Sequence, residues 1–583
     1  MNDDRLIPTN GTPSVVTSII RINGNDIPRT YQVLTIVVVK EVNRIPFSKI
    51  VIKDGDPAQE DFPVSNDELF TPGNEIEILV GYQANEDVIF KGIIVKQGIK
   101  IRQNGSSMLR IDCRDKTFKT TLVPRNRYFN EVKDSEAIEG ILSDYDLSTD
   151  ISSSEVTHQE VVQYETTDWE FILTRSEPNG LLCFVDDGTL SIQKPNFDQD
   201  PVLTATYGST ILEFDGEIDA RQQFAKVKAS SWDYTNQELV EVDAVEPEIE
   251  EGGNLISTDL AATGDDQELV LRHSGHLLQD ELQTWADAQL LHIRLAKIQG
   301  RVKFQGSPVV KPNTLINLKG LGDRFNGPVF VSGVRQEIQN GTWHTDLQFG
   351  LPEKWEVGKK KTNVSLSTYP NKNNTGLQIG VVTQLQDDPD GEYRILVKLP
   401  IIDNEADGVW ARIATLDAGE NRGTFFLPEI GDEVVVGFLN NDSHDPIVVG
   451  VLHSSSKAAP FEATDDNFEK GYVSKEGIKL VFDDEKKSLT IETPAGKKIT
   501  LDEDEAVIKL EDENNNKIIM DSNGIVIESG GGLELKSNQD LKIEGGTNLE
   551  LKAGASFKAE GSAGAELSTS AVAVLKGSLV QIN

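Results

Sequence analysis

The stretch LELKSNQDLKIEGGTNLELKAGASFKAEGSAGAEL, residues 533–567, decides the fold of the C-terminal part of the chain. Pairs of apolar or small residues, each pair separated by one residue, begin every 8 residues along it. The pairs are Leu533 and Leu535, Leu541 and Ile543, Leu549 and Leu551, Phe557 and Ala559, and Ala565 and Leu567. Small residues such as Gly545 and Gly546 fill the space between pairs and suit a corner. A fixed period is the signature of a repeat architecture, and each octad predicts one short strand and one turn.

An octad strand has an apolar face only two residues wide, so a single chain cannot bury a core with it. A single-chain β-helix needs ~20 or more residues per coil, whereas an octad completes one face and passes to the next. We therefore expect a trimeric octad-repeat β-helix. This needle is expected to span residues 475–583, because similar pairs with looser spacing precede the regular octads, the first of them at Leu489. The predicted trimer core is Leu533, Leu535, Leu541, Ile543, Leu549, Leu551, Phe557 and Leu567. About 12 or 13 octads, stacked ~4.7 Å apart, would make a needle on the order of 55 to 60 Å long.

The composition excludes several classes of protein. The 583 residues include 38% hydrophobic and 26% charged residues, as in soluble folded chains of several domains. A net charge of -39 would be repelled by phosphate backbones and anionic lipids, so no nucleic-acid partner is expected. Cys113 and Cys183 cannot form a disulfide framework in so long a chain. The start MNDDRLIPTNG lacks the features of a cleaved export signal, and apolar runs stay near five residues, against the ~20 of a membrane span.

Upstream of the needle the chain is predicted to be mainly β, with a small α/β insertion. Residues 1–125 read as strands and turns of a first barrel. Residues 126–204 form the insertion, with a helix beginning at Asp134 and a capping box from Thr167 to Glu170. Residues 205–356 form a second barrel that contains one long helix over 278–298, ended by Gly300.

The next segments follow from composition and strand spacing. Residues 357–376 are rich in Lys, Asn, Ser and Thr and are predicted to be a linker. Residues 377–455 hold five short strand-like runs, which fit an OB-fold barrel. The predicted strands are 377–384, 393–399, 409–415, 433–438 and 447–452. Residues 456–474 connect this barrel to the needle.

The barrel segment also carries a recognisable motif set. It reads G-x-V-x5-D-P-D-G-x5-V-x-L-P from Gly380 to Pro400, Trp410-x-Arg412, LPEIGDEVVVGF from Leu427 to Phe438, and Asp445-Pro446-x3-Gly450. This set strongly resembles the VgrG spike family of type VI secretion and related contractile injection systems, and also phage baseplate hub and spike proteins. Trp169-Glu170-Phe171-Ile172-Leu173 and Gly180 to Phe184 look like the hub region of that family.

The resemblance implies a homotrimeric hub, built from the two barrels, that joins a tail tube to a membrane-puncturing needle. Its implied partners are the tail tube protein, baseplate proteins, a PAAR-type tip protein and cargo effectors, with only transient membrane contact. Assembly would take place in the bacterial cytoplasm, followed by expulsion. The predicted tip-protein site is Leu579, Val580, Gln581, Ile582 and Asn583. About 20 residues between the OB barrel and the repeats, and the end at Asn583, leave no expected enzymatic domain.

No catalytic, cofactor or metal site is expected from the residues. His273 and His276 are the one close histidine pair, and a zinc site needs three or four ligands. The acidic turn from Asp387 to Gly391 lacks the twelfth-position Glu of a calcium loop and reads as a hairpin turn. The acidic run 241–251 reads as a solvated loop, with docking of a basic partner as the alternative. The rival function is a phage-like tail fibre or tail enzyme that acts on surface glycans or peptidoglycan.

Overall fold

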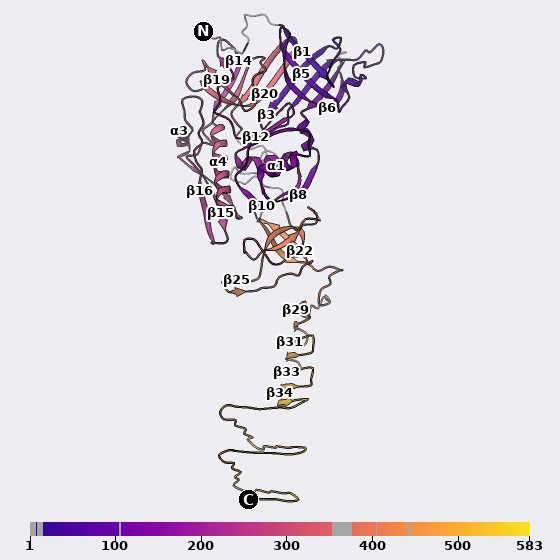
Figure 1. Cartoon of the computed structure of the whole chain (residues 1–583), viewed down its shortest axis with the longest axis vertical. Helices are drawn as coiled ribbons and strands as arrows, with labels where there is room; N and C mark the ends of the chain where they lie inside the picture. Colours follow the sequence, from indigo (N-terminus) through magenta and orange to yellow (C-terminus); the bar gives the residue numbers. More distant parts are fainter. Residues whose placement is uncertain are drawn as a thin grey trace. The chain divides into compact units, whose positions relative to one another are not determined.

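The computed structural model describes residues 7, 15–103, 107–352, 376–403, 405–439, 442 and 445–582. It divides into two compact units, Met1–His453 and Ser454–Asn583, and is mainly β with few helices (Figure 1). Most of the predicted linker 357–376 lies outside the described residues, as do His444 and Asn583. None of the helices described is long and apolar enough to cross a membrane.

One large sheet joins the strands expected to form two barrels. The first-half strands are β1 (Val16–Ile22), β2 (Asn25–Asp26), β3 (Val33–Glu41), β4 (Phe47–Lys53), β5 (Glu75–Tyr82), β6 (Asn85–Ile101) and β7 (Ser107–Arg114), with the short helices η1 (Glu68–Phe70) and η2 (Lys116–Thr121). The second-half strands are β13 (Thr204–Thr206), β14 (Ile211–Ile218), β18 (Ile298–Gln305), β19 (Leu315–Lys319), β20 (Gly327–Gln339) and β21 (Thr342–Phe349). All thirteen belong to one sheet, in which β20 pairs with β3.

Each half of this sheet has its own core. Ile36, Ile50 and Phe90 are fully or almost fully buried in the first half, and Val302, Phe304 and Leu347 in the second. Burial of such side chains is worth about 1.5–3 kcal/mol each. Ile338 and Trp343 of the second half belong to the first core, so the halves are joined by packing as well as by the pairing of β3 with β20.

The insertion follows the first half. It contains β8 (Pro124–Lys133), α1 (Asp134–Leu142), β9 (Ser148–Ile151), β10 (Thr157–Thr167), α2 (Asp168–Ser176), η3 (Glu177–Asn179), β11 (Leu182–Asp186) and β12 (Thr189–Gln193). The predicted helix start at Asp134 is confirmed. The capping box is confirmed as well, because Oγ1 of Thr167 accepts from the Glu170 amide at 3.2 Å and Glu170 accepts from the Thr167 amide.

A separate α+β layer interrupts the second half of the sheet. It consists of β15 (Lys226–Asp233), β16 (Glu238–Asp243), β17 (Glu268–His273), the short helices α3 (Ser257–Ala261) and η4 (Ala262–Gly264), and the long helix α4 (Gln279–Leu295). Leu282, Trp285 and Ile293 of α4 pack on the sheet. The prediction that Gly300 ends the helix is wrong, because α4 ends at Leu295 and Gly300 lies in β18. A Cβ at Gly300 would lie 2.2 Å from the Asp215 carbonyl oxygen, so glycine allows β14 to approach β18.

The OB barrel is closed, with strand order β22-β23-β24-β28-β27. Its strands are β22 (Gln378–Gln384), β23 (Ile395–Lys398), β24 (Val409–Ile413), β27 (Glu433–Phe438) and β28 (Pro446–Val451), within one or two residues of the five predicted runs. Val382, Val397, Val434 and Val436 are almost fully buried in its core. A hairpin of β25 (Ala418–Gly419) and β26 (Arg422–Gly423) was not predicted.

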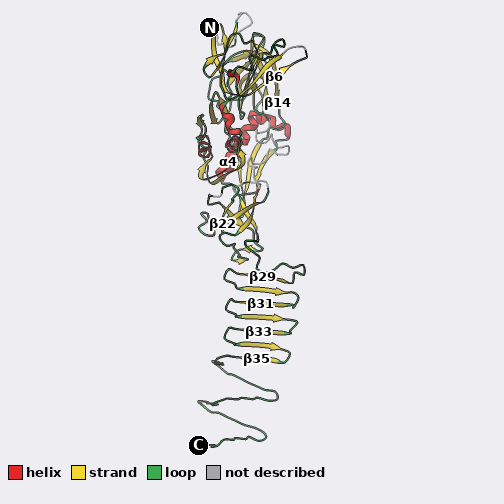
Figure 2. Ribbon diagram, turned by 90° about the vertical axis from the view of Figure 1, so that its right-hand side faces the viewer, coloured by secondary structure: helices red, strands yellow, loops and turns green. Residues whose placement is uncertain are grey.

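The second unit begins as an antiparallel meander of seven strands in sequence order (Figure 2). The strands are β29 (Glu469–Val473), β30 (Lys479–Asp483), β31 (Ser488–Glu492), β32 (Lys498–Asp502), β33 (Val507–Glu511), β34 (Lys517–Asp521) and β35 (Gly524–Glu528). Each five-residue strand pairs with its neighbours in the same chain. Between residues 529 and 582 the described chain forms no strand, although the octads continue.

Candidate functional site

The meander carries a continuous apolar face. In register, Leu489 faces Leu501, Ile491 faces Ile499, and Ile499 in turn faces Leu510. The pairing continues to the last strand, where Ile518 faces Ile527. Side chains two residues apart share one face of a strand, so the apolar doublets form a ladder two residues wide. Ile491 and Leu501 remain 40% and 43% exposed, so the part of the chain that the structure describes leaves the ladder largely uncovered.

The predicted needle core residues are much more exposed than a core requires. The exposed fractions are 59% for Leu533, 60% for Leu535, 57% for Leu541, 56% for Ile543, 57% for Leu549, 65% for Leu551, 66% for Phe557 and 85% for Leu567. The single chain does not bring them together. Of the predicted tip site, Leu579 and Ile582 are 82% and 84% exposed, and Asn583 lies outside the described residues.

Opposite charges alternate along one margin of the meander. Lys479 faces Glu492, Glu492 faces Lys498, and Lys498 faces Glu511. Lys517 and Glu528 close the row with an ion pair of 2.9 Å. Exposed pairs contribute only about 0–1 kcal/mol each. The row therefore gives this register only a small preference, because slipping a strand would move each Lys away from the Glu that it faces.

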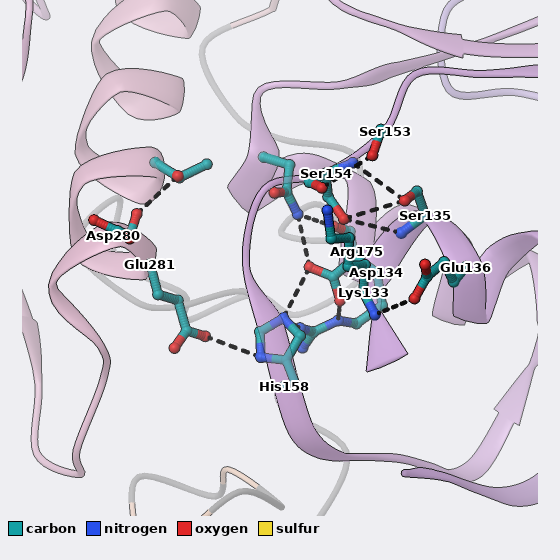
Figure 3. Close-up of polar contacts among 12 residues, drawn as sticks. Lys133, Asp134, Ser135, Glu136, Ser153, Ser154, His158, Arg175, Asp280 and Glu281 are labelled. Atoms are coloured by element: carbon teal, nitrogen blue, oxygen red, sulfur yellow. Dashed lines mark hydrogen bonds and ion pairs between the residues drawn. The ribbon is translucent and has the colours of Figure 1, made fainter. Parts of the chain in front are cut away.

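A buried polar cluster ties the insertion together (Figure 3). Asp134 begins α1, and its carboxylate accepts hydrogen bonds from Nε of Arg175 at 2.5 Å and from Nδ2 of Asn179 at 2.8 Å. Nε2 of His158 lies 3.2 Å from the same carboxylate, and Nδ1 of His158 lies 4.0 Å from Glu281 of α4. The cluster therefore reaches from the insertion to the α+β layer. The cluster was not predicted from the sequence, because the partners of Asp134 follow it by 24, 41 and 45 residues.

The buried carboxylate of Asp134 is stabilised in its charged form by the cations and hydrogen-bond donors around it. Burial raises the pKa of Asp134, but the Arg175 guanidinium and the hydrogen bond from His158 outweigh burial and leave that pKa below its ordinary value. The carboxylate is thus held ionised by its partners. Asp134 and Arg175 are 4% and 2% exposed, so the pair connects α1 to α2 inside the fold and is not placed to meet a substrate.

The histidine pair considered for zinc lies at the seam between the α+β layer and the OB barrel. Nε2 of His273 is 3.1 Å from Oδ2 of Asp442, and both side chains are almost fully buried. His276 instead packs against the Tyr234 ring, with ring centroids 5.0 Å apart. Within the described part of the chain, no three His, Cys, Asp or Glu side chains are grouped so that they could hold a metal ion. The pair joins two domains.

A second contact with the OB barrel comes from the two-stranded sheet of β8 and β10. Val162 packs into the barrel core beside Val382 and Ile395. Burial raises the pKa of the neighbouring Glu160 carboxyl well above its usual value, and the positive charge of Arg394 opposes this shift. Burial thus disfavours the ionised form of Glu160 in this seam.

The acidic turn of the OB barrel forms its own ion pairs. The Asp388 carboxylate accepts from the amides of Glu392 and Arg394 at 2.8 and 3.0 Å. The Arg394 guanidinium also donates to it, at 2.9 and 2.6 Å. These contacts occupy the carboxylate as the predicted hairpin turn requires.

The prediction of a solvated loop over residues 241–251 is wrong in part. Glu241 to Asp243 end strand β16. Glu246 accepts two hydrogen bonds from the buried Arg294 side chain, at 2.6 and 2.9 Å, and Glu251 pairs with the buried Lys297. Both cations lie at or just after the end of α4, where the helix dipole also favours positive charge. The acidic run thus fastens the loop to α4.

A cleft of about 700 Å³ lies where the halves of the large sheet meet, lined by residues that include Arg44, His292 and Arg301. The Arg301 guanidinium is already paired with Asp215 at 2.8 Å and with Asp346 at 3.5 Å. His292 Nε2 lies 2.8 Å from the Pro352 carbonyl oxygen. Arg301 and His292 are therefore engaged in contacts with other residues of the fold.

Two models of known protein families match this chain, one before the OB barrel and one at the barrel itself. A family model described as the Alg8 N-terminal domain matches residues 12–340, more than half of the chain. A model described as the type VI secretion system/phage-baseplate injector OB domain matches residues 378–453. The OB barrel is thus the domain that the motif resemblance indicated.

Individual relatives match over a shorter stretch. The type VI secretion system spike protein VgrG1a of Pseudomonas aeruginosa is 33% identical over 72 residues, 12% of this chain and 11% of that protein. VgrG3 of Vibrio cholerae is 37% identical over 62 residues, 11% of this chain and 6% of that protein. The matched stretch is thus about a tenth or less of the length of these relatives.

Among solved structures, the half-lidded Francisella PdpA-VgrG complex contains a chain similar to this one, with a TM-score of 0.52 and 10% identity over 89% of this chain and 88% of that chain. The lidless PdpA-VgrG complex gives a TM-score of 0.51 with 10% identity, over 90% of this chain and all of that chain. At this level of identity the likeness concerns the fold.

Proposed function

Since the chain belongs to the family of the Alg8 N-terminal domain and carries the OB domain of type VI secretion spike and phage-baseplate injector proteins, we propose that it is the homotrimeric hub and spike of a contractile injection machine. Its role is mechanical and non-enzymatic. The first unit forms the hub that joins tail tube and baseplate, and the second unit forms the needle that leads through the target envelope.

The observation that carries this proposal is the uncovered apolar ladder of the second unit. Ile491 and Leu501 are about two-fifths exposed in the meander, and Leu541 and Leu549 are more than half exposed in the octads. Soluble chains do not leave contiguous apolar surface of this extent uncovered. Two further copies of the same chain would cover it symmetrically.

The two sections of the second unit suggest two ways of packing. Strands of the meander are already paired within one chain, so each chain would contribute a finished sheet to the trimer. Within the described residues the octads from Leu533 onward form no strand, so we expect their strands to pair with those of the other two chains. The expected β-helix core is Leu533, Leu535, Leu541, Ile543, Leu549, Leu551, Phe557 and Leu567.

The tip would hold a separate protein. Leu579, Val580 and Ile582 are 50–84% exposed, and three copies of them would make an apolar platform. We expect a PAAR-type tip protein to cover it and cargo effectors to be carried by the assembled spike. The particle would be assembled in the bacterial cytoplasm and then expelled outside or into a target cell.

Sedimentation velocity and mass measurement of the purified full chain test this proposal. A stable trimer at micromolar concentration is expected, with a C-terminal unit that resists denaturant after the first unit has unfolded. A monomer at this concentration would contradict the proposal. Cleavage of peptidoglycan or surface glycans by the purified trimer would contradict the non-enzymatic role and favour the tail enzyme.

A further inference from the structure

The β25–β26 hairpin projects from the OB barrel (Figure 1). The segments on both sides of it carry exposed apolar side chains. Leu416, just before the hairpin, is 97% exposed, and Phe425 and Ile430, in the irregular segment that leads back to β27, are 74% and 64% exposed. The hairpin is pinned by an ion pair of 2.8 Å between Arg422 and Asp417 and by the Thr424 amide, which donates to the Asp417 carbonyl. A two-stranded hairpin is marginal by itself, so these contacts hold in shape the segment from Leu416 to Ile430, which we call the arm. Among the described residues, its apolar side chains Leu416, Phe425 and Ile430 remain largely exposed.

A second uncovered apolar surface lies on the outside of the same barrel. Leu377, just before β22, is 69% exposed, and Ile379, near the start of β22, is 39% exposed. Val449 and Val451 on β28 are 50% and 51% exposed. Strand β27 lies between β22 and β28. We call these four residues, with Gly437 of β27, the aliphatic strip.

The aliphatic strip is shaped as a shallow seat. A Cβ at Gly437 would lie 3.3 Å from Leu377 and 3.9 Å from Val449, so the two side chains flank a position that has no side chain of its own. The barrel is closed and offers no free strand edge in this region. A partner must therefore be held by side-chain packing rather than by strand addition.

The occupant that fits best is a second copy of this chain. A cyclic trimer needs two different, complementary patches on each subunit, because its contacts are heterologous and close after three steps. The arm and the aliphatic strip are two such patches on one barrel. The barrel ends at Val451, and the second unit begins at Ser454, so a trimeric needle would hold three barrels close together.

We propose that the β25–β26 arm of one chain packs, through Leu416 and Phe425, on the aliphatic strip of the next chain, so that three OB barrels close into a ring. This proposal rests on the trimer proposed above and names the surface that joins its barrels. Each Phe offers on the order of 150–250 Å² of contact, which makes Phe425 the main anchor of the arm.

Directed cross-linking tests the proposal in the full chain. Leu416→Cys and Val449→Cys are combined in one variant and treated with a short bis-maleimide; the native Cys113 and Cys183 are fully buried and should stay silent. The double variant should give covalent trimers in denaturing gels. Each single variant should stay monomeric in the gel, and a mixture of the two singles, assembled together, should give covalent dimers.

A matched control replaces Val449 by a position on the first half of the sheet. Ile101, at the end of β6, is 66% exposed, so Leu416→Cys with Ile101→Cys has the same number of reactive thiols. This control should give no covalent trimer. If Leu416→Cys alone gives dimers, the arms meet each other and the heterologous contact is refuted.

The same experiment separates failure of this proposal from failure of the trimer. If the double variant sediments as a trimer but does not cross-link, the arm does not lie on the strip, while the trimer stands. If it sediments as a monomer, and the wild-type chain does too, the trimer itself is refuted. Protection of the arm only after a different protein is added would assign it to that partner instead.

A solution measurement gives a second readout. Leu416→Asp should weaken trimer association at least tenfold, since it places a charge in a closed apolar contact. Asn421→Asp, at the tip of the same hairpin, adds the same charge away from the apolar side chains and should leave association unchanged. Equal effects of the two substitutions would refute the packing of Leu416.

Discussion

Nε of Arg175 donates to Oδ1 of Asp134 at 2.5 Å, and both side chains are almost completely enclosed. This ion pair links the end of α2 to the start of α1, and through His158 it reaches Glu281 on α4. A buried pair of this kind adds little net stability, but removing one partner leaves an uncompensated charge. The relationship therefore makes the insertion sensitive to single substitutions.

Arg175→Met should lower the free energy of unfolding of the first unit by about 3–5 kcal/mol, because Asp134 would keep a buried charge without its main partner. Arg335→Met is the matched control, since Arg335 makes an exposed pair with Glu337 at 3.2 Å and should cost about 0–1 kcal/mol. All six tryptophans lie at or before residue 410, so tryptophan fluorescence in denaturant reports on this unit alone. Equal losses of stability in the two variants would contradict the role of the buried Arg175–Asp134 pair.

Glu160→Gln should stabilise the first unit at higher pH. The pKa of Glu160 is raised by burial, so its neutral form favours the folded state; this stability is present below the pKa of the unfolded chain and is lost as pH rises through the folded pKa. Gln keeps the shape without the charge. We expect a gain of about 1 kcal/mol at pH 8 and little change at pH 4, measured by thermal unfolding.

Glu155→Gln provides the control for this pH dependence, because Glu155 is exposed and precedes the same strand. It should leave the difference between pH 4 and pH 8 unchanged. A Glu160→Gln variant whose stability follows the wild-type pH profile would show that the carboxyl is ionised in the seam.

Gly300→Ala should destabilise the first unit by about 2 kcal/mol or more, since the added Cβ meets the Asp215 carbonyl at 2.2 Å and a backbone shift must follow. Gly98→Ala, also within a strand, meets nothing within 4 Å and should be neutral or slightly stabilising. Denaturant midpoints of the two variants give the comparison. A harmless Gly300→Ala would mean that β14 and β18 have room to separate.

Leu541→Asp together with Leu549→Asp should abolish trimer formation, because six charges would enter the core of three chains. Asn538→Asp together with Thr547→Asp adds the same charge between the doublets and should leave a trimer. Sedimentation velocity distinguishes the two. Trimers of the first variant would refute the proposed needle core.

Deletion of Leu579 to Asn583 should leave the trimer intact but remove tip-protein binding, since the apolar platform would be lost while the octads before it remain. Co-purification with a PAAR-type protein from the same organism measures the effect. Undiminished binding by the shortened chain would place the tip site elsewhere.

Local patterns predicted the parts of this fold whose contacts are short in sequence. The five OB strands, the start of α1 and the capping box at Thr167 depend on alternation, turn residues and a four-residue motif. The end of α4 was predicted three residues too late, because Gly300 resembles a helix stop but instead allows the close approach of a strand 84 residues earlier.

Local sequence patterns could not predict the buried Asp134 cluster or the contacts between the OB barrel and the rest of the first unit. Asp134 and Arg175 are 41 residues apart, and His273 meets Asp442 across two domains. Single charged residues of this kind resemble ordinary surface residues in the sequence. The acidic run at 241–251 was misread for the same reason, since its partners Arg294 and Lys297 follow only after a helix.

The even spacing of the meander has a consequence for how such chains change over generations. Lys479, Lys498 and Lys517 begin β30, β32 and β34 at intervals of 19 residues, so each interval is one complete strand pair with both turns. Duplicating or deleting one 57-nucleotide stretch of coding sequence would change the meander by two strands, roughly 9 to 10 Å. The apolar ladder and the Lys/Glu margin would continue across the new junction. The length of the second unit can thus change in steps of two strands, independently of the hub.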